Sequence, residues 1–149
     1  MSVLTLRPAR TTDAGATGAI LSAFAADTDW MPQLHSAAEN IGFAGAMIDR
    51  GWVTVAEAER RVIGFMARDR EDIDALYVAP DQRGRGVGAA LLRQAQAAVP
   101  RLGLWTFQAN KGAQRFYKRH GFAEVNRTDG AANDEKLPDI RMLWTREGA

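Results

Sequence analysis

The feature that most constrains this chain is a glycine-rich loop that follows an expected strand and precedes an expected helix. Residues 73–78 form an apolar run typical of a strand, and turn-forming residues at 79–81 end it. The loop at 82–88 contains Gly84, Gly86 and Gly88. Apolar residues at helical spacing continue from the loop to Pro100, where the helix is expected to end. A strand, a glycine loop and a helix in this order predict a cradle for an anion.

The physical basis of such a cradle is the backbone. Glycines let successive N–H groups approach a ligand closely, and a helix N-terminus adds unpaired donors and about half a positive charge. Arg83 and Arg85 add fixed positive charge of a kind that suits phosphate. The loop therefore predicts a ligand that carries a pyrophosphate.

Two familiar phosphate-binding motifs do not fit this loop. A Walker loop has Lys followed by Ser or Thr after its last glycine, whereas Gly88 is followed by Ala89 and Ala90. A dinucleotide fingerprint needs a different glycine spacing and an acidic residue about 20 residues later. The next expected strand, at 102–107, has no acid at its end. A plain turn at a helix start stays open on the glycine spacing alone.

A second segment combines a helix start with aromatic side chains. Asn110 stands where an expected strand passes into a helix, so its amide is suited either to cap the helix or to meet a ligand. Ala113, Phe116 and Tyr117 share one face of that helix. Both aromatic residues are expected in the core. A buried tyrosine, however, usually needs a partner for its hydroxyl, which a second phenylalanine would not.

Composition removes several classes of function. The 149 residues contain no cysteine, which excludes disulfides, thiolate metal sites and a cysteine nucleophile. They contain two histidines, so we expect no metal site. The formal net charge of +1 does not favour nucleic acid or membrane binding, and no apolar run approaches the ~20 residues that span a bilayer. The first residues lack the pattern of a signal peptide, so we expect a soluble cytoplasmic domain.

Hydrophobic periodicity predicts elements in the order β-α-α-β-β-β-α-β-α-β-β. Strands are expected at 3–7, 52–56, 62–67, 73–78, 102–107, 122–127 and 140–145. Helices are expected from a cap at Thr11 or Thr12 to 27, from a cap at Ser36 to 50, at 87–99, and from a cap at Asn110 to 121. Strands in hairpin succession followed by β-α-β crossovers predict an α/β fold, an α+β mixed sheet with helices on its faces. We expect residues 1–149 to form a single domain.

With both segments in place, the chain resembles the GNAT superfamily of acetyl-CoA-dependent N-acetyltransferases over nearly its whole length. The family's first motif, Gln/Arg-x-x-Gly-x-Gly/Ala, is matched by Arg83, Gly86 and Gly88. The second motif, Asn-x-x-Ala-x-x-Phe-Tyr-x-x-x-Gly-Phe, is matched by Asn110, Ala113, Phe116, Tyr117, Gly121 and Phe122. The resemblance implies the GNAT acyl-CoA N-acyltransferase fold and an enzyme that transfers an acetyl group to an amine.

The resemblance also implies where acetyl-CoA, the cosubstrate, binds. In the family, the backbone of the strand before the glycine loop pairs with the pantetheine arm, as an added strand would. The loop amides hold the pyrophosphate, Asn110 and Phe116 lie beside the cofactor, and no metal is required. The cofactor-binding residues implied in this way are Leu76, Tyr77, Val78, Arg83, Gly84, Arg85, Gly86, Val87, Gly88, Asn110, Ala113, Phe116 and Tyr117.

The same resemblance implies that Tyr117 is the general acid that protonates the departing CoA thiolate. Tyrosine and thiol have reference pKa values of about 10 and 8.5, so a phenol can assist that departure. Some members use a Glu early in the strand before the loop as a base, and Asp72 and Asp74 are the candidates here. Strand alternation predicts that both carboxylates share one face with Leu76 and Val78. The alternatives are a solvated strand end and a base that acts through water.

The resemblance implies an acceptor site built by the first two helices, the loop between them and parts of the late strands. The residues expected to contact the acceptor are Phe24, Trp30, His35 and Trp105. Trp30 stands beside acidic residues, a combination that suits a cationic amine. The alternative is that Trp30 covers the edge of the core.

The leading hypothesis is the acetylation of a small-molecule primary amine, which attacks acetyl-CoA directly in a ternary complex. A protein N-terminus or a lysine as acceptor is one alternative, and a non-catalytic acyl-CoA-binding sensor is another. Neither nucleic acid nor a membrane is an expected partner, because the net charge is close to zero. A homodimer would be compatible with the family.

Overall fold

The computed structural model describes residues 3–147. These form one seven-stranded sheet with four α-helices and two short 3-10 helices, in the predicted order. No helix in this range is long and apolar enough to cross a bilayer. In chain order the elements are β1 (Thr5–Pro8), η1 (Thr11–Asp13), α1 (Ala14–Asp27), α2 (Ala37–Asp49), β2 (Val53–Ala58), β3 (Arg61–Asp69), β4 (Asp72–Val78), η2 (Pro80–Gln82), α3 (Val87–Ala98), β5 (Arg101–Phe107), α4 (Lys111–Arg119), β6 (Ala123–Thr128) and β7 (Asp139–Thr145).

The helix caps agree with the sequence except at the first helix. Ser36 and Asn110 each accept the backbone N–H of the residue three positions on, which confirms both predicted caps. The prediction of a cap at Thr11 or Thr12 is wrong. Both threonines lie in η1, and Asp13 is the N-cap of α1.

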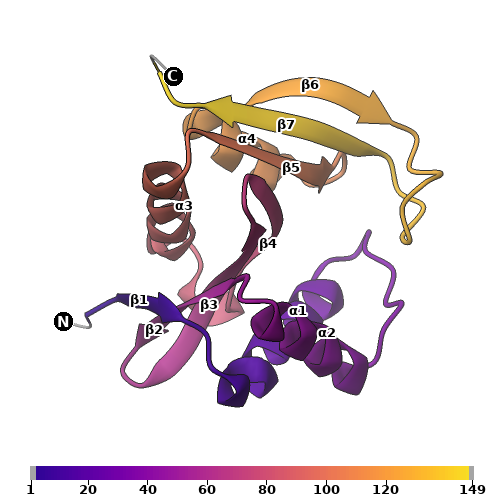
Figure 1. Cartoon of the computed structure of the whole chain (residues 1–149). Coiled ribbons are helices and arrows are strands. Elements are labelled where there is room, and N and C mark those ends of the chain that lie inside the picture. Colours follow the sequence, from indigo (N-terminus) through magenta and orange to yellow (C-terminus); the bar gives the residue numbers. More distant parts are fainter. Residues whose placement is uncertain (1–2, 148–149) are drawn as a thin grey trace.

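Helices cover the two faces of the sheet unequally (Figure 1). α3 and α4 pack on one face, where the larger core includes Leu91 of α3 and Met142 of β7. α1 and α2 pack on the other face over the first strands, with Ile20 and Phe65 in a second core. Beyond β4, that second face has no helix over it within the described chain, and Trp105 of β5 is 49% exposed there.

β4 and β5 are the parallel pair of this sheet, and they part soon after they meet (Figure 1). Their one register position is Asp72 beside Gly103, and the Gly103 N–H donates to the carbonyl of Glu71 at 2.8 Å. β5 instead stays paired with β7 along its whole length. The sheet is therefore open between β4 and β5 toward the C-terminal end of both strands.

A bulge at Asp74 changes which side chains of β4 share a face. The register between β3 and β4 shifts at this point, so Asp74 is an extra residue without a partner on β3. The prediction that Asp72 and Asp74 share a face with Leu76 and Val78 is therefore wrong for Asp72. Ile73 packs with those two apolar residues in the core under α3 and α4. Alternation from Ile73 puts Asp72 on the opposite face.

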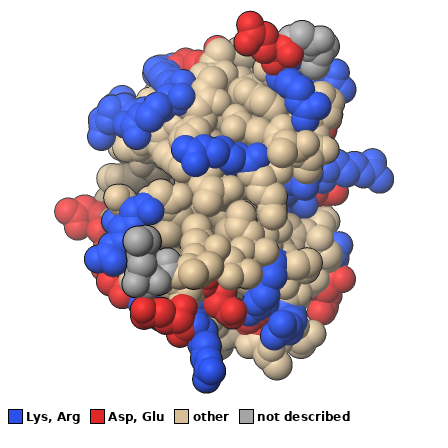
Figure 2. All heavy atoms as spheres, turned by 90° about the vertical axis from the view of Figure 1, so that its left-hand side faces the viewer, with Lys and Arg blue, Asp and Glu red and all other residues tan. Residues whose placement is uncertain are grey.

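Charge is also distributed unevenly over the molecule. Figure 2 shows that the side carrying α3 exposes many Lys and Arg side chains, whereas Asp and Glu side chains lie mainly toward its lower part and its rim. The net charge of +1 therefore hides local fields of either sign.

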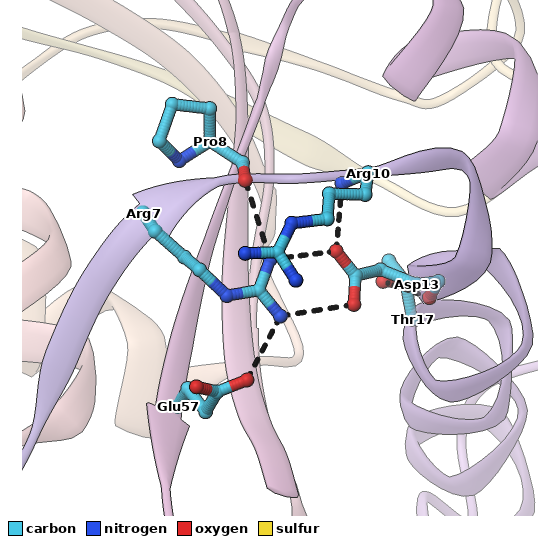
Figure 3. A network of polar contacts seen from close by, with 6 residues as sticks. All are labelled: Arg7, Pro8, Arg10, Asp13, Thr17 and Glu57. Atoms are coloured by element: carbon cyan, nitrogen blue, oxygen red, sulfur yellow. Dashed lines mark hydrogen bonds and ion pairs between the residues drawn. The ribbon is translucent and has the colours of Figure 1, made fainter. Parts of the chain in front are cut away.

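Arg7 joins the edge of the sheet to the start of the first helix (Figure 3). Its guanidinium donates to both carboxylate oxygens of Asp13, at 2.8 and 3.1 Å, and to Glu57 of β2 at 2.9 Å. Asp13 also accepts the N–H of Arg10, and its carbonyl accepts the hydroxyl of Thr17. The bonds from Arg7 are the main reason that the pKa of Asp13 lies below its ordinary value. The network fixes the start of α1 against β1 and β2.

Replacing Asp13 by Ala should destabilise the fold, because it leaves the largely buried Arg7 with one carboxylate. We expect a loss of about 3 kcal/mol in the free energy of unfolding at neutral pH, measured by urea denaturation. Since the folded-state pKa of Asp13 is depressed, its contribution is complete above the ordinary pKa and fades as pH falls through the folded value. Asp81→Ala breaks the exposed pair with Arg61 and should cost much less. Equal losses in the two variants would contradict a special role for Arg7.

Candidate active site

A narrow cleft lies where β4 and β5 part. Residues of β4, β5 and α4 border it. The bordering residues are Ile73, Asp74, Ala75, Leu76, Tyr77, Leu104, Trp105, Thr106, Phe107, Ala113 and Tyr117. The cleft thus brings together predicted site residues from β4, β5 and α4.

The strand edges that face this cleft carry unpaired backbone groups. Ala79, directly after β4, donates its N–H to a β3 carbonyl at 2.8 Å. Alternation along the antiparallel pair then points the N–H and C=O groups of Leu76 and Val78 away from β3 and toward the cleft. On β5, Gly103 donates to β4, so the same groups of Trp105 also face β4. An extended chain that carries amide groups could pair with these edges.

The glycine loop follows β4 and is shaped by left-handed backbone conformations. Gly84 and Gly86 have φ values of +75° and +83°, and Gly86 is the N-cap of α3. Within residues 3–147, the backbone N–H groups of 86–89 find no acceptor. The Arg83 side chain reaches back to the Val78 carbonyl at 3.4 Å. The geometry of an anion cradle, a row of free donors at a helix start, is therefore present beside the cleft.

Basic side chains are exposed on the loop and on α4. They are Arg83 and Arg85 of the loop and Lys111, Arg115, Lys118 and Arg119 of α4. An anionic ligand on the loop would lie in the positive field of Arg83 and Arg85.

The remaining predicted cofactor residues lie where α3, α4 and β4 meet. Ala113 borders the cleft. A Cβ on Gly88 would lie 3.5 Å from the Phe116 ring, so the start of α3 packs closely on α4. Val87 is buried, and its side chain faces Gly64 of β3. Only the backbone of Val87 is therefore available to a ligand.

Asn110 caps α4 and also keeps a donor free. Its side-chain oxygen accepts the N–H of Ala113 at 3.0 Å. Its side-chain NH₂ group donates to no residue in the described part of the chain. Asn110 can therefore cap the helix through its side-chain oxygen and still meet a ligand through its NH₂ group.

Tyr117 is a buried polar side chain of the cleft. It is 7% exposed, and its ring lies 5.2 Å from that of Phe116 and 5.4 Å from that of Phe122. Its hydroxyl oxygen keeps some exposure at the cleft and makes no hydrogen bond to any described residue. Burial, with a smaller effect of Tyr77, raises the pKa of Tyr117. Tyr117 is therefore a protonated donor that lacks a partner.

The two candidate carboxylates of β4 have different surroundings. Asp72 pairs with Arg141 of β7, with 3.2 Å between Nη2 and Oδ1. Asp74 borders the cleft and makes no hydrogen bond to a described residue. Partial burial, with the negative charges of Asp69 and Asp72, raises the pKa of Asp74, and Arg50 opposes this shift. Asp74 is thus an exposed, unpaired carboxylate beside the cleft, and its pKa is raised.

Aromatic side chains form a wall of ring contacts next to the cleft, on the α1 side. The Phe24 ring lies 4.9 Å from Tyr77 and 6.2 Å from Trp30, and Trp30 lies 5.7 Å from Phe107 at the end of β5. The predicted acceptor residues Phe24 and Trp30 do not themselves border the cleft, but they pack on Tyr77 and Phe107, which do. Sequence reasoning missed Phe107, which resembles any apolar strand residue. Its one signal is its place three residues before Asn110.

The other two predicted acceptor residues differ in position. Trp105 borders the cleft, and the Arg141 guanidinium lies 5.7 Å from its ring centre. His35 packs on Phe43 of α2 at 4.8 Å and is not among the residues that border the cleft. The structure therefore keeps Trp105 with the site and does not bring His35 to it.

Both tyrosines should ionise late in an alkaline titration. Tyr77 and Tyr117 are the tyrosines of this chain, and burial raises the pKa of each. The ultraviolet absorbance of tyrosinate should be absent at about pH 10, where the urea-unfolded chain reaches its midpoint. Since the unfolded chain ionises first, stability should fall as pH rises beyond that value. Tyr117→Phe should remove about half of the late signal. A folded chain with a tyrosinate midpoint near that of the unfolded chain would show that the phenols are solvated.

Relatives by sequence support the family that the motifs suggest. A family model described as an acetyltransferase (GNAT) domain matches residues 48–124. The peptidyl-lysine N-acetyltransferase YjaB of Escherichia coli (strain K12) is 38% identical over 93 residues, which cover 62% of this chain and 63% of that protein. The chain therefore spans less than two thirds of the length of this relative.

Relatives by structure extend the agreement to the whole fold. The solution structure of apo-form YjaB from Escherichia coli has a TM-score of 0.79 at 26% identity, and the match covers 97% of this chain and 99% of that one. YncA from Salmonella typhimurium, solved with acetyl-CoA, has a TM-score of 0.74 at 20% identity over 99% of this chain and 96% of that one. The family model covers the glycine loop, the cleft and Tyr117, and more than half of the sequence. The chain belongs to the GNAT acetyltransferase family.

Proposed function

We propose that this protein is an acetyl-CoA-dependent N-acetyltransferase that acts on a primary amine. The observation that carries the proposal is the cleft between β4 and β5, which combines unpaired strand edges with the unpaired hydroxyl of Tyr117. Free N–H donors at the start of α3 follow directly after β4. A cofactor with a diphosphate, an amide-bearing arm and a thioester matches these features. Family membership supports the same cofactor.

The backbone of β4 is proposed to hold the arm of the cofactor. The free N–H and C=O groups of Leu76 suit an amide of pantetheine, which would lie beside β4 as an added strand, and the free N–H of Val78 is left for the thioester carbonyl. The free NH₂ group of Asn110 offers a further donor from α4. The pyrophosphate would accept the N–H groups of 86–89, and Arg85 would add charge. The acetyl end would then lie within reach of Tyr117.

The reaction is a direct transfer between cofactor and acceptor. The neutral amine attacks the thioester carbonyl, the C–N bond forms, and the Val78 N–H stabilises the developing oxyanion. As the intermediate collapses, the C–S bond breaks, Tyr117 donates its proton to the departing sulfur, and the proton that the nitrogen loses restores the phenol. Burial disfavours a thiolate as it disfavours a phenolate, so the raised pKa of Tyr117 does not by itself oppose this transfer. The products are the acetylated amine and the CoA thiol.

We assign Asp74 as the group that removes a proton from the acceptor. An amine arrives protonated at neutral pH and needs a free electron pair to attack. The Asp74 carboxylate borders the cleft and is unpaired, and its raised pKa makes it a stronger base than an ordinary aspartate. Asp72 is the weaker candidate because Arg141 already pairs with it.

The proposed acceptor is a small primary amine with an apolar part next to the nitrogen. The aromatic wall of Phe24, Trp30 and Phe107 suits the apolar part, and Asp74 suits the amine. A lysine of a peptide is the second candidate, since it also carries an amine at the end of an apolar stem and two relatives are named peptidyl-lysine N-acetyltransferases. The exposed Trp105 beside the cleft would give a peptide a surface. We place the reaction in the cytoplasm, where acetyl-CoA is available.

A thiol-release screen tests this function. Wild-type protein is incubated with acetyl-CoA and polyamines, amino acids, aryl amines, aminoglycosides or lysine peptides, and CoA thiol is measured. We expect release with at least one amine. Tyr117→Phe should lower kcat by about 10²–10⁴-fold and leave acetyl-CoA affinity nearly unchanged. Binding of acetyl-CoA without release by any amine would favour the sensor alternative, and the absence of binding at micromolar protein would contradict the proposal.

Gly86→Ala should weaken acetyl-CoA binding beyond its effect on stability. Gly86 and Gly51 both have positive φ and open space around them, so Ala at either position costs about 1 kcal/mol of backbone strain. Gly86 orients the loop donors, whereas Gly51 follows α2, away from the cleft. Calorimetric titration should give a Kd about tenfold higher for Gly86→Ala and unchanged for Gly51→Ala. Equal affinities would remove the loop from cofactor binding.

The pH dependence of kcat/KM should report Asp74. Activity should rise with pH along a limb whose midpoint lies above about 4, the ordinary pKa of aspartate. Asp74→Asn should abolish this limb. Arg50→Gln should move it to higher pH, because Arg50 lowers the pKa of Asp74. Asp72→Asn should move it to lower pH by removing a neighbouring negative charge. A profile that Asp74→Asn leaves unmoved would assign the base to water.

A further inference from the structure

We propose that Gln114 of α4 is a positioning residue that holds the end of β5 away from β4 and so keeps the cofactor cleft open. The inference rests on the proposed function, because it assigns the cleft to acetyl-CoA. It concerns a side chain that would not touch the cofactor and that lies between the motif residues Ala113 and Tyr117.

The contacts of Gln114 are made with the last residues of β5. The side chain is 7% exposed, and its amide nitrogen donates to the Phe107 carbonyl at 3.1 Å and to the Gln108 carbonyl at 2.8 Å. The Phe107 carbonyl also accepts the N–H of Asn110 at 3.0 Å. A single buried amide thus satisfies two carbonyls where β5 ends.

The Phe107 carbonyl is one that continued pairing with β4 would use. Gln108 donates its N–H to Pro138 of the β7 side at 2.9 Å, so alternation points the backbone groups of Phe107 toward β4. A carbonyl buried there without a donor would favour closure of the two strands. The Asn110 N–H gives this carbonyl one donor, and Gln114 adds a second from α4 and also bonds the Gln108 carbonyl, so the strand end is satisfied without β4.

The side chain of Gln108 adds further hydrogen bonds at the end of β5. The Gln108 side-chain amide donates to the carbonyls of Thr128 in β6 and Asp139 in β7, each at 3.2 Å. Two glutamines therefore fasten the end of β5 to α4 on one side and to the β6–β7 pair on the other. Phe107 of the aromatic wall and Asn110 are placed by the same segment.

Gln114 also couples the strand end to the proposed acid. Tyr117 follows one turn later on α4, so the helix turn that anchors on β5 carries the phenol into the cleft. A shift of this turn would change the width of the cleft and the position of the phenol together. A role confined to stability would leave cofactor affinity unchanged in molecules that remain folded.

The test compares two amide deletions of the same kind. Gln114→Met keeps the length of the side chain and removes both hydrogen bonds. Gln96→Met is the matched control, because the Gln96 amide donates to the His120 carbonyl at 3.0 Å, at the opposite end of α4. Kd for acetyl-CoA is measured by calorimetry, and KM and kcat by thiol release, at a temperature where circular dichroism shows both variants folded.

We expect Gln114→Met to raise the Kd and the KM for acetyl-CoA about tenfold, and Gln96→Met to leave both within about twofold. If Gln114→Met does not fold, Gln108→Met tests the same hold from the other side and should raise the Kd in the same direction. Wild-type affinity in a folded Gln114→Met would overturn the inference. If Gln114→Met does not fold, wild-type affinity in Gln108→Met would overturn it instead. Either result leaves the proposed function intact. A wild-type chain that binds no acetyl-CoA would overturn both.

Discussion

β4 and β5 pair at a single register position, Asp72 beside Gly103, and the rest of the site depends on their divergence beyond it. In a continuous parallel sheet, the N–H and C=O groups at the end of β4 would bond to β5, and no ligand could enter. Here β5 stays with β7 and diverges from β4, so the edge of β4 is free beyond Asp72. Unpaired backbone groups in a largely buried place are costly, and a ligand that carries amides offsets that cost. The opening of the sheet is thus both a structural defect and a binding surface.

The electrostatics of the cleft follow from the same opening. Its walls are side chains from two cores, so groups inside it are partly removed from water. Removal from water keeps the Tyr117 phenol protonated and makes the Asp74 carboxylate more basic, which are the states that an acid and a base need at neutral pH. A chain without cysteine can run thioester chemistry in such a site, because the reactive sulfur arrives with the cofactor. The charges of the glycine loop and α4 lie apart from this chemistry, on the side where an anionic cofactor would enter.

The sequence predicted the features that depend on local signals. Hydrophobic periodicity predicted the order of the elements, Ser36 and Asn110 marked their helix starts, and three glycines marked the loop before α3. It did not predict features that depend on contacts between distant segments. The bulge at Asp74 carries no glycine or proline to reveal it, and it reversed the expected face of the neighbouring carboxylate. Phe107 and Gln114 have ordinary residue types for a strand and a helix, and their roles emerge only where β5 meets α4. His35 packs on Phe43 of α2 and does not border the cleft.

Amide hydrogen exchange, followed by NMR with and without acetyl-CoA, is the most direct test of the claim that the open edge of β4 receives the cofactor. Without cofactor, the N–H groups of Leu76 and Val78 should exchange quickly, whereas those of Ala75 and Tyr77, which point to β3, should be protected. Saturating acetyl-CoA should slow exchange at Leu76 and Val78 and leave the other two nearly unchanged. Protection of Leu76 and Val78 in the free protein, or bound acetyl-CoA that leaves their exchange unchanged, would contradict the account.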